Sequence, residues 1–226
     1  MKMAETITST LEQLNELGLY VGMGDVYLAK MTTEDTPTTK PEYGTPYLAC
    51  EGITAGLTPK YAPGTQSASD RTIRNLNLLT GMDVKVEYPR VLPQVRCDML
   101  GREQDENGGE LVGDGMAPLF AVGVYATRDD GTYLMRWIYK VRFHEGATNM
   151  QTMEDGAINY QIPTIEGNGV RLAYKHKTAG GKTVRLTEYC YDSAGKEEPM
   201  TPEEFFSQVR GPWDTAEAAA TEQPAS

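Results

Sequence analysis

The amino-acid sequence predicts a mainly β (α+β) fold, in which a β-sandwich or barrel-like body carries a flanking α-helix. The first observation is the alternation of apolar and charged residues over 82–88, which is typical of a half-buried strand. The second is the pair Asp130-Gly131 between two long β-rich runs, because Asp-Gly favours a tight hairpin turn. The third is that helical periodicity is confined to short segments. A chain of 226 residues suits one domain with appendages, or at most two small domains.

The first predicted element is a short helix within an N-terminal arm, residues 1–19. Ser9 and Glu12 form a potential capping box, and leucines recur at helical spacing up to Gly18. A helix of under three turns needs a surface to pack on. We therefore expect the arm to dock on the body or on a neighbouring molecule.

The body is predicted to span residues 20–210 and to begin with strands at 26–29, 47–53 and 82–88. Between the last two strands, residues 57–81 contain prolines, a glycine and a polar tract, and we expect them to form a long loop. A loop of this length in a compact domain is usually functional or disordered. It carries one acid and three bases, which are Lys60, Arg71 and Arg74.

A helix is expected after the strand at 82–88. Pro89 and Pro93 bracket its start, apolar residues form a stripe along it, and Gly101 provides a C-terminal cap. The glycine-rich segment that follows, 102–115, is predicted to be an acidic loop with a net charge of −4. Its acids include Asp105, Glu106 and Glu110.

The strongest local pattern is a long hairpin formed by residues 119–127 and 132–144. Alternate residues of the second run are apolar or aromatic, and the others mix aliphatic and basic groups. We expect the first set to share one face toward the core, and the second to be partly covered by a partner or a loop. The predicted core face is Tyr133, Met135, Trp137, Tyr139, Val141 and Phe143.

Four further elements are expected toward the C-terminus. Residues 157–165 alternate like a strand, and residues 170–177 and 183–191 are predicted to pair as a second hairpin. A short helix at 202–209 closes the body, and 211–226 is predicted to be a flexible tail.

Composition argues against nucleic-acid and membrane binding. The net charge of −11 disfavours attraction to phosphates. The longest nearly apolar stretch, 117–126, is too short for a membrane-spanning helix, and residues 1–10 lack the apolar core of a secretion signal. We therefore expect a protein that is made and folded in a cytoplasm.

No catalytic, metal-binding or cofactor-binding pattern is evident. His144 and His176 have no second ligand at metal-binding spacing. The three cysteines, Cys50, Cys97 and Cys190, are widely separated and odd in number, which suits reduced thiols. We expect a protein that is not an enzyme and binds neither a metal nor a cofactor.

Several segments between residues 20 and 170, about two thirds of the chain, form a recognisable ordered series. They are Gly24-Asp25-Val26-Tyr27-Leu28-Ala29, Tyr43-Gly44-Thr45-Pro46, Gly52-Ile53, Asp83-Val84-Lys85-Val86-Glu87-Tyr88, Leu92-Pro93, Leu100-Gly101, Ala117-Pro118, Asp130-Gly131, Trp137-Ile138-Tyr139-Lys140-Val141-Arg142-Phe143 and Tyr160-Gln161-Ile162-Pro163-Thr164-Ile165. This series resembles the major tail tube proteins of bacteriophages with long non-contractile tails, the siphovirus type.

That resemblance implies a virion tail protein. In the family, each subunit is a β-sandwich flanked by a helix, six subunits form a ring, and rings stack into a tube whose lumen is a continuous β-barrel. The genome passes through the lumen without specific binding. The implied partners are further copies of the chain and the tape measure, tail terminator and distal tail proteins.

An extended loop between early strands reaches the adjacent ring in that family, and residues 57–81 occupy the matching position. We expect the bases of this loop to face an acidic surface of the next ring, formed by 102–115 or 145–155. Individual surface pairs contribute well under about 1 kcal/mol, so they would set register while apolar contacts supply affinity. The candidate contact residues are Lys60, Arg71, Arg74, Asp105, Glu106 and Glu110.

The alternative is a non-enzymatic β-sandwich binding module, such as a tail tip, capsid decoration or carbohydrate-binding domain. Such a module is expected to expose aromatic side chains on loops. Trp213 is the obvious candidate, whereas the alternation around Trp137 and Tyr139 favours a core position.

Overall fold

The computed structural model describes residues 17–68, 71–146, 162–178 and 180–214, with the backbone alone for 65–68 and 71–75. The N-terminal helix predicted within residues 1–19 lies outside the described residues, except for its last positions. The acidic residues of 147–155 and most of the predicted C-terminal tail also lie outside them.

Antiparallel strands dominate the described residues, which confirms the mainly β class. The strands of the main sheet are β1 (Tyr20–Met23), β2 (Val26–Thr33), β3 (Glu42–Tyr43), β4 (Tyr47–Cys50), β5 (Thr54–Ala68), β6 (Arg71–Glu87), β9 (Leu119–Arg128), β10 (Tyr133–Glu145), β11 (Thr164–Val170) and β14 (Glu188–Asp192). Two small ribbons pair β7 (Glu103–Gln104) with β8 (Glu110–Leu111), and β12 (His176–Lys177) with β13 (Thr183–Val184). The helical elements are α2 (Pro93–Leu100), α3 (Pro202–Phe206) and the 3₁₀ turn η1 (Pro212–Asp214).

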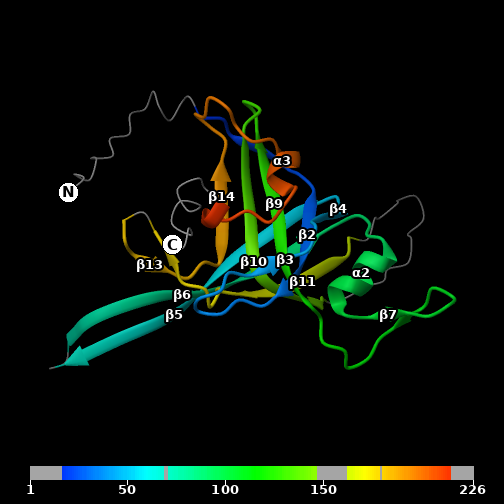
Figure 1. Ribbon diagram of the computed structural model, residues 1–226, viewed down its shortest axis with the longest axis horizontal. Coiled ribbons are helices and arrows are strands. Elements are labelled where there is room, and N and C mark those ends of the chain that lie inside the picture. Colours follow the sequence, from blue (N-terminus) through cyan, green and yellow to red (C-terminus); the bar gives the residue numbers. More distant parts are fainter. Residues whose placement is uncertain (1–16, 69–70, 147–161, 179, 215–226) are drawn as a thin grey trace, which may run out of the picture.

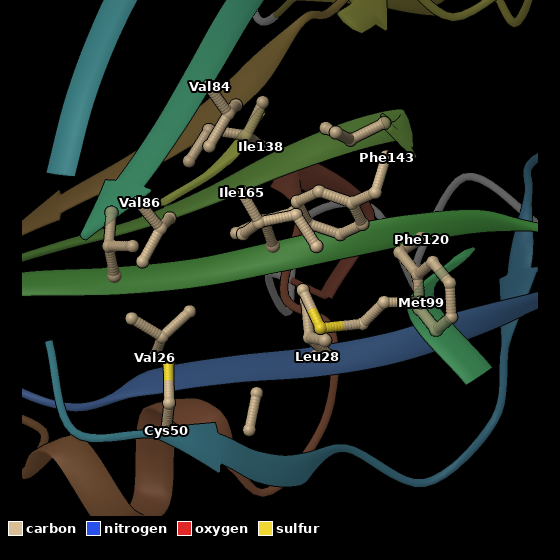
Figure 2. Close-up of a cluster of buried hydrophobic side chains, with 14 of the residues drawn as sticks. Val26, Leu28, Cys50, Val84, Val86, Met99, Phe120, Ile138, Phe143 and Ile165 are labelled. Carbon is tan, nitrogen blue, oxygen red and sulfur yellow. The ribbon is translucent and has the colours of Figure 1, made fainter. Parts of the chain in front are cut away.

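The main sheet follows the order β3-β2-β9-β10-β11-β6-β5 and curves back on itself. Val26 and Leu28 of β2 lie in the same apolar cluster as Val84 and Val86 of β6, although three strands separate β2 from β6 along the sheet. Figure 2 shows these side chains converging with those of β9, β10, β11 and α2. This first core therefore fills the inside of the curved sheet.

A second core, rich in aromatic residues, lies on the other face of β2, β9 and β10. Tyr27, Trp137 and Phe206 are in ring contact there, with Tyr27 and Phe206 stacked at 4.5 Å between centroids. Phe206 belongs to α3, which begins at a capping box formed by Thr201 and Glu204. The central strands are thus covered on both faces, which explains their nearly continuous apolar sequence.

The prediction of one core face along 132–144 is wrong. The register of β10 against β9 shifts between Ile138 and Val141, and Lys140 has a left-handed φ of 52°. Before this bulge, Trp137 faces the second core. After it, Val141 faces the first core, because an inserted residue reverses which side alternate residues occupy.

The long hairpin and the internal helix are confirmed. β9 and β10 pair around the turn at Asp130-Gly131, where Gly131 has a φ of 80°. α2 begins at Pro93 and ends at Gly101 in the left-handed conformation that a C-terminal cap requires. The helix predicted at 202–209 is confirmed in its first part, as α3.

Two predictions from local pattern are corrected. Residues 57–81 are not a loop, because they belong to β5 and β6. The second hairpin is limited to β12 and β13, and β14 pairs with β10 instead. Residues 157–161 of the strand predicted at 157–165 lie outside the described residues, and its last two residues, Thr164 and Ile165, belong to β11.

Candidate assembly surfaces

The most prominent surface feature is a hairpin that projects from the body at one end of the molecule (Figure 1). β5 and β6 pair along their whole length, whereas β6 pairs with β11 only from Gly81 to Glu87. Residues 61–68 and 71–80, here called the projecting hairpin, therefore have no third strand beside them in the described chain. Eight residues of extended strand give it a reach of about 25 Å.

Apolar side chains of the projecting hairpin lie in solvent. Tyr61 is 58% exposed, Leu76 52% and Leu78 45%. An isolated two-stranded hairpin is at best marginally stable in water, and large exposed apolar residues on one mark a contact surface. The projecting hairpin is therefore the best candidate for an intermolecular contact.

The predicted bases occupy different places on this hairpin. Lys60 lies at its base, where its Nζ is 2.6 Å from Asp83 Oδ1 and 3.0 Å from Asn168 Oδ1. Arg71 and Arg74 lie near the tip, in register with Ala68 and Gln66. Lys60 therefore supports the hairpin from within the molecule, whereas the backbone of Arg71 and Arg74 lies at the end of the hairpin away from the body.

The predicted acids lie on a lobe formed by α2 and residues 102–117. Asp105 closes a turn, with its Oδ1 accepting hydrogen bonds from the amides of Asn107 and Gly109 at 2.9 and 2.7 Å. Glu106 is exposed. Asp105 is thus used to shape the lobe, and Glu106 remains available to a partner.

Glu110 is largely buried within the same lobe, with 12% of its side chain exposed. It accepts hydrogen bonds from Arg96 of α2 and from Arg102, which also pairs with Glu145 at 2.6 Å. Its carboxylate raises the pKa of Arg96 through their hydrogen bond. Glu110 therefore ties the β7–β8 ribbon to α2 and is not an outward-facing acid.

The projecting hairpin and the lobe formed by α2 and residues 102–117 lie at opposite ends of the molecule. Figure 1 shows the hairpin at one end of the long axis and α2 with β7 at the other. Within one chain, the structure does not bring Arg71 or Arg74 to Glu106. A contact between the two surfaces would join two molecules end to end, as a heterologous contact.

An apolar groove of about 410 Å³ is a surface that sequence reasoning missed. Its lining combines β1, the start of β5 and the paired ends of β9 and β10, including Tyr20, Ile53, Leu57 and Leu134. Tyr20 is 57% exposed and Ile53 44%. No local signal identifies this groove, because its walls come from four separate segments.

No chemical site emerges from the residues that the structure describes. They contain no group of three or more His, Cys, Asp or Glu side chains placed to hold a metal ion. Trp137 and Tyr139 are fully buried, and Trp213 packs on Tyr139 and Tyr174. Trp137 and Tyr139 are thus core residues, and Trp213 is partly buried against the second core. Among the described helices, none is long and apolar enough to cross a membrane.

Replacement of Glu110 by glutamine is expected to lower the free energy of unfolding by about 1–3 kcal/mol, because a charged acceptor shared by two arginines is lost in a mostly buried position. Urea denaturation measures the loss. Glu106→Gln, at an exposed position of the same lobe, provides the matched control and is expected to stay within about 0.5 kcal/mol of the unaltered protein. Equal effects of the two substitutions would contradict the structural role given to Glu110.

No protein-family model matches the chain, and no curated protein matches it.

Proposed function

We propose that the protein is a non-enzymatic structural subunit that assembles with further copies of itself into stacked hexameric rings, forming the tail tube of a bacteriophage with a long non-contractile tail. The observation that carries the proposal is the projecting hairpin, which leaves the body as a two-stranded ribbon and exposes Tyr61, Leu76 and Leu78. The ordered series of segments that resembles tail tube proteins supports it further.

The elements of that series occupy central positions in the fold. Gly24 approaches Tyr125 so closely that an added Cβ would lie 1.9 Å from the ring, and its amide donates to the carbonyl of Tyr125 at 3.0 Å. Residues 83–88 run through and just past the part of β6 that enters the first core. These segments therefore build the body that holds the hairpin in place.

The charge of the chain suits a conduit for DNA. A net charge of −11 repels phosphates, so a genome slides past such a surface without adhering to it. The tape measure, tail terminator and distal tail proteins are the further partners that this function entails.

The proposal predicts rings or tubes of uniform diameter when the purified protein is concentrated. Negative-stain microscopy and size-exclusion light scattering are the measurements. In a shortened variant, residues 63–77 are replaced by Asn-Gly, which joins the cross-strand neighbours Ala62 and Leu78 by a two-residue turn. This variant is expected to stay folded and monomeric, because it loses Leu76 and all of the hairpin beyond Ala62 and Leu78 and keeps both cores.

Two outcomes would count against the proposal. Assembly of the shortened variant to the same extent as the unaltered protein would remove the hairpin from the interface. A protein that is monomeric at every concentration would favour the single-molecule binding module.

A further inference from the structure

The two edges of the projecting hairpin are chemically different. An open strand edge presents unpaired N–H and C=O groups, which are a template for a strand of another chain. In the described chain β5 pairs only with β6, and no strand other than β5 pairs with β6 before Gly81. Arg171 donates from its amide to the carbonyl of Thr80 at 3.2 Å and from its side chain to the carbonyl of Leu79 at 3.5 Å. The described hairpin therefore has one open edge on each side, and that of β6 reaches as far as Leu79. The sequence decides which of the two edges is usable.

The open edge of β5 is blocked by prolines. Pro59 lies opposite Met82 and Pro63 opposite Asn77. Because proline has no N–H, each of these antiparallel pairs is of the non-hydrogen-bonded type, in which main-chain groups point away from the partner strand. The N–H groups that Pro59 and Pro63 lack are therefore ones that would have pointed outward, away from β6. Prolines at such positions prevent strand addition along an edge.

The open edge of β6 keeps all its donors. Asn77 is paired with Pro63, so the N–H and C=O of Asn77 point outward from the hairpin. The alternation of antiparallel pairs gives Asn75 and Leu79 the same orientation. No proline occurs between Arg71 and Gly81. This edge therefore offers the N–H groups of Asn75, Asn77 and Leu79 and the carbonyls of Asn75 and Asn77 to a further strand.

We propose that a strand of a second copy of this chain adds to the outer edge of β6 over residues 73–79, while the edge of β5 stays free. The inference rests on the proposed function, and it deepens that function by naming the main-chain groups that join two subunits.

Charge favours a second copy as the occupant. Residues 57–81 carry three bases and one acid, a net of +2, so the rest of the chain carries −13. A basic hairpin is thus attracted to the acidic body of another copy of the same chain. A single usable edge also limits the size of the assembly, because hairpins with two open edges would pair with one another in an endless sheet.

The test introduces into β6 a proline like those that β5 already contains. Asn77→Pro removes one outward N–H opposite Pro63 and leaves the pairing of β5 with β6 intact. A matched pair is Asn75→Pro and Thr65→Pro, because these residues lie opposite each other on the two edges. Light scattering against concentration gives the association constant of each variant.

The expected result is asymmetric. Asn77→Pro and Asn75→Pro lower the association constant roughly tenfold or more, because each removes a main-chain hydrogen bond at the interface and leaves its acceptor unpaired. Thr65→Pro associates like the unaltered protein. Circular dichroism and thermal melting confirm that all three monomers are folded.

Residue-resolved hydrogen exchange on the unaltered protein tests the same groups without substitution. The amides of Asn75, Asn77 and Leu79 are expected to exchange freely in the monomer and to become protected on assembly, while the amides of Tyr61 and Thr65 stay unprotected. Two results would overturn the inference and leave the proposed function standing. In the first, Asn77→Pro associates as strongly as the unaltered protein. In the second, the unaltered protein assembles but these three amides gain no protection. An unaltered protein that never assembles would overturn both.

Discussion

Asp35→Ala is expected to lower the free energy of unfolding by about 3–5 kcal/mol, the cost of breaking a buried ion pair from one side. The side chain of Asp35 is 0% exposed, and its Oδ1 lies 2.8 Å from Nζ of Lys140. Its Oδ2 accepts hydrogen bonds from the amides of Ala173 and Tyr174. Removing the carboxylate therefore leaves a cation and two main-chain donors without their buried acceptor.

The position of this carboxylate explains the size of the effect. Lys140 is the left-handed residue of the β10 bulge, and Ala173 follows strand β11, so Asp35 holds three separate segments together. Burial by itself lowers the pKa of Lys140, but its hydrogen bonds with Asp35 and Glu34 outweigh burial and raise that pKa. The ammonium group thus stays charged and depends on its acidic partners.

Guanidinium denaturation measures the loss, and Glu34→Ala is the matched control. Glu34 also lies 2.8 Å from Nζ of Lys140, but 64% of its side chain is exposed. An exposed pair contributes about 1 kcal/mol or less. If the two alanine substitutions destabilised the protein equally, the buried role of Asp35 would be refuted.

Alkaline unfolding is the second large effect, expected to begin above pH 10. Burial raises the pKa of Tyr139 and of Tyr43 above the ordinary value of 10.0. Below pH 10, folded and unfolded chains both keep these phenolic protons. Above it, the unfolded chain loses them and the folded chain keeps them, so the stability falls as the pH rises. Above pH 10, each of the two tyrosines lowers the free energy of unfolding by about 1.4 kcal/mol per pH unit.

Denaturant titrations between pH 9 and pH 11, with tyrosinate absorbance recorded in parallel, measure this loss. Tyr43→Phe provides the informative variant, because the hydroxyl of Tyr43 is buried with no well-formed hydrogen bond and only a weak contact with the backbone of Lys140. It is expected to be neutral or stabilising at pH 7 and to make the alkaline loss less steep. A stability that stays constant up to pH 11 would contradict the prediction.

Elements with a short-range signal were predictable from the sequence. The Asp130-Gly131 turn, the proline at the start of α2 and Gly101 at its end each act within a few residues. The bulge at Lys140 has no such signal, since alternation continues unbroken through it in the sequence. The tertiary pairing of β10, with β14 before the bulge and β11 after it, accompanies the change of face.

The sequence predicted which residues form the candidate surface, but it did not predict that they form strands. Residues 57–81 were singled out by their length, polarity and positive charge, but prolines and polar residues argued for a loop. They form strands because an edge strand needs only its inward-facing donors, and both prolines lie where the N–H would face outward.

The sequence by itself determined the mainly β class, the central hairpin and the helices α2 and α3, because turns, caps and alternation act between near neighbours. Tertiary structure alone decided that Lys60 and Glu110 are paired within the molecule and that β14 joins β10. It also decided that the projecting hairpin leaves the body with no third strand beside it in the described chain. The physical reason is that ion pairs and strand pairing join residues far apart in the chain, and burial selects among partners that the sequence leaves equivalent.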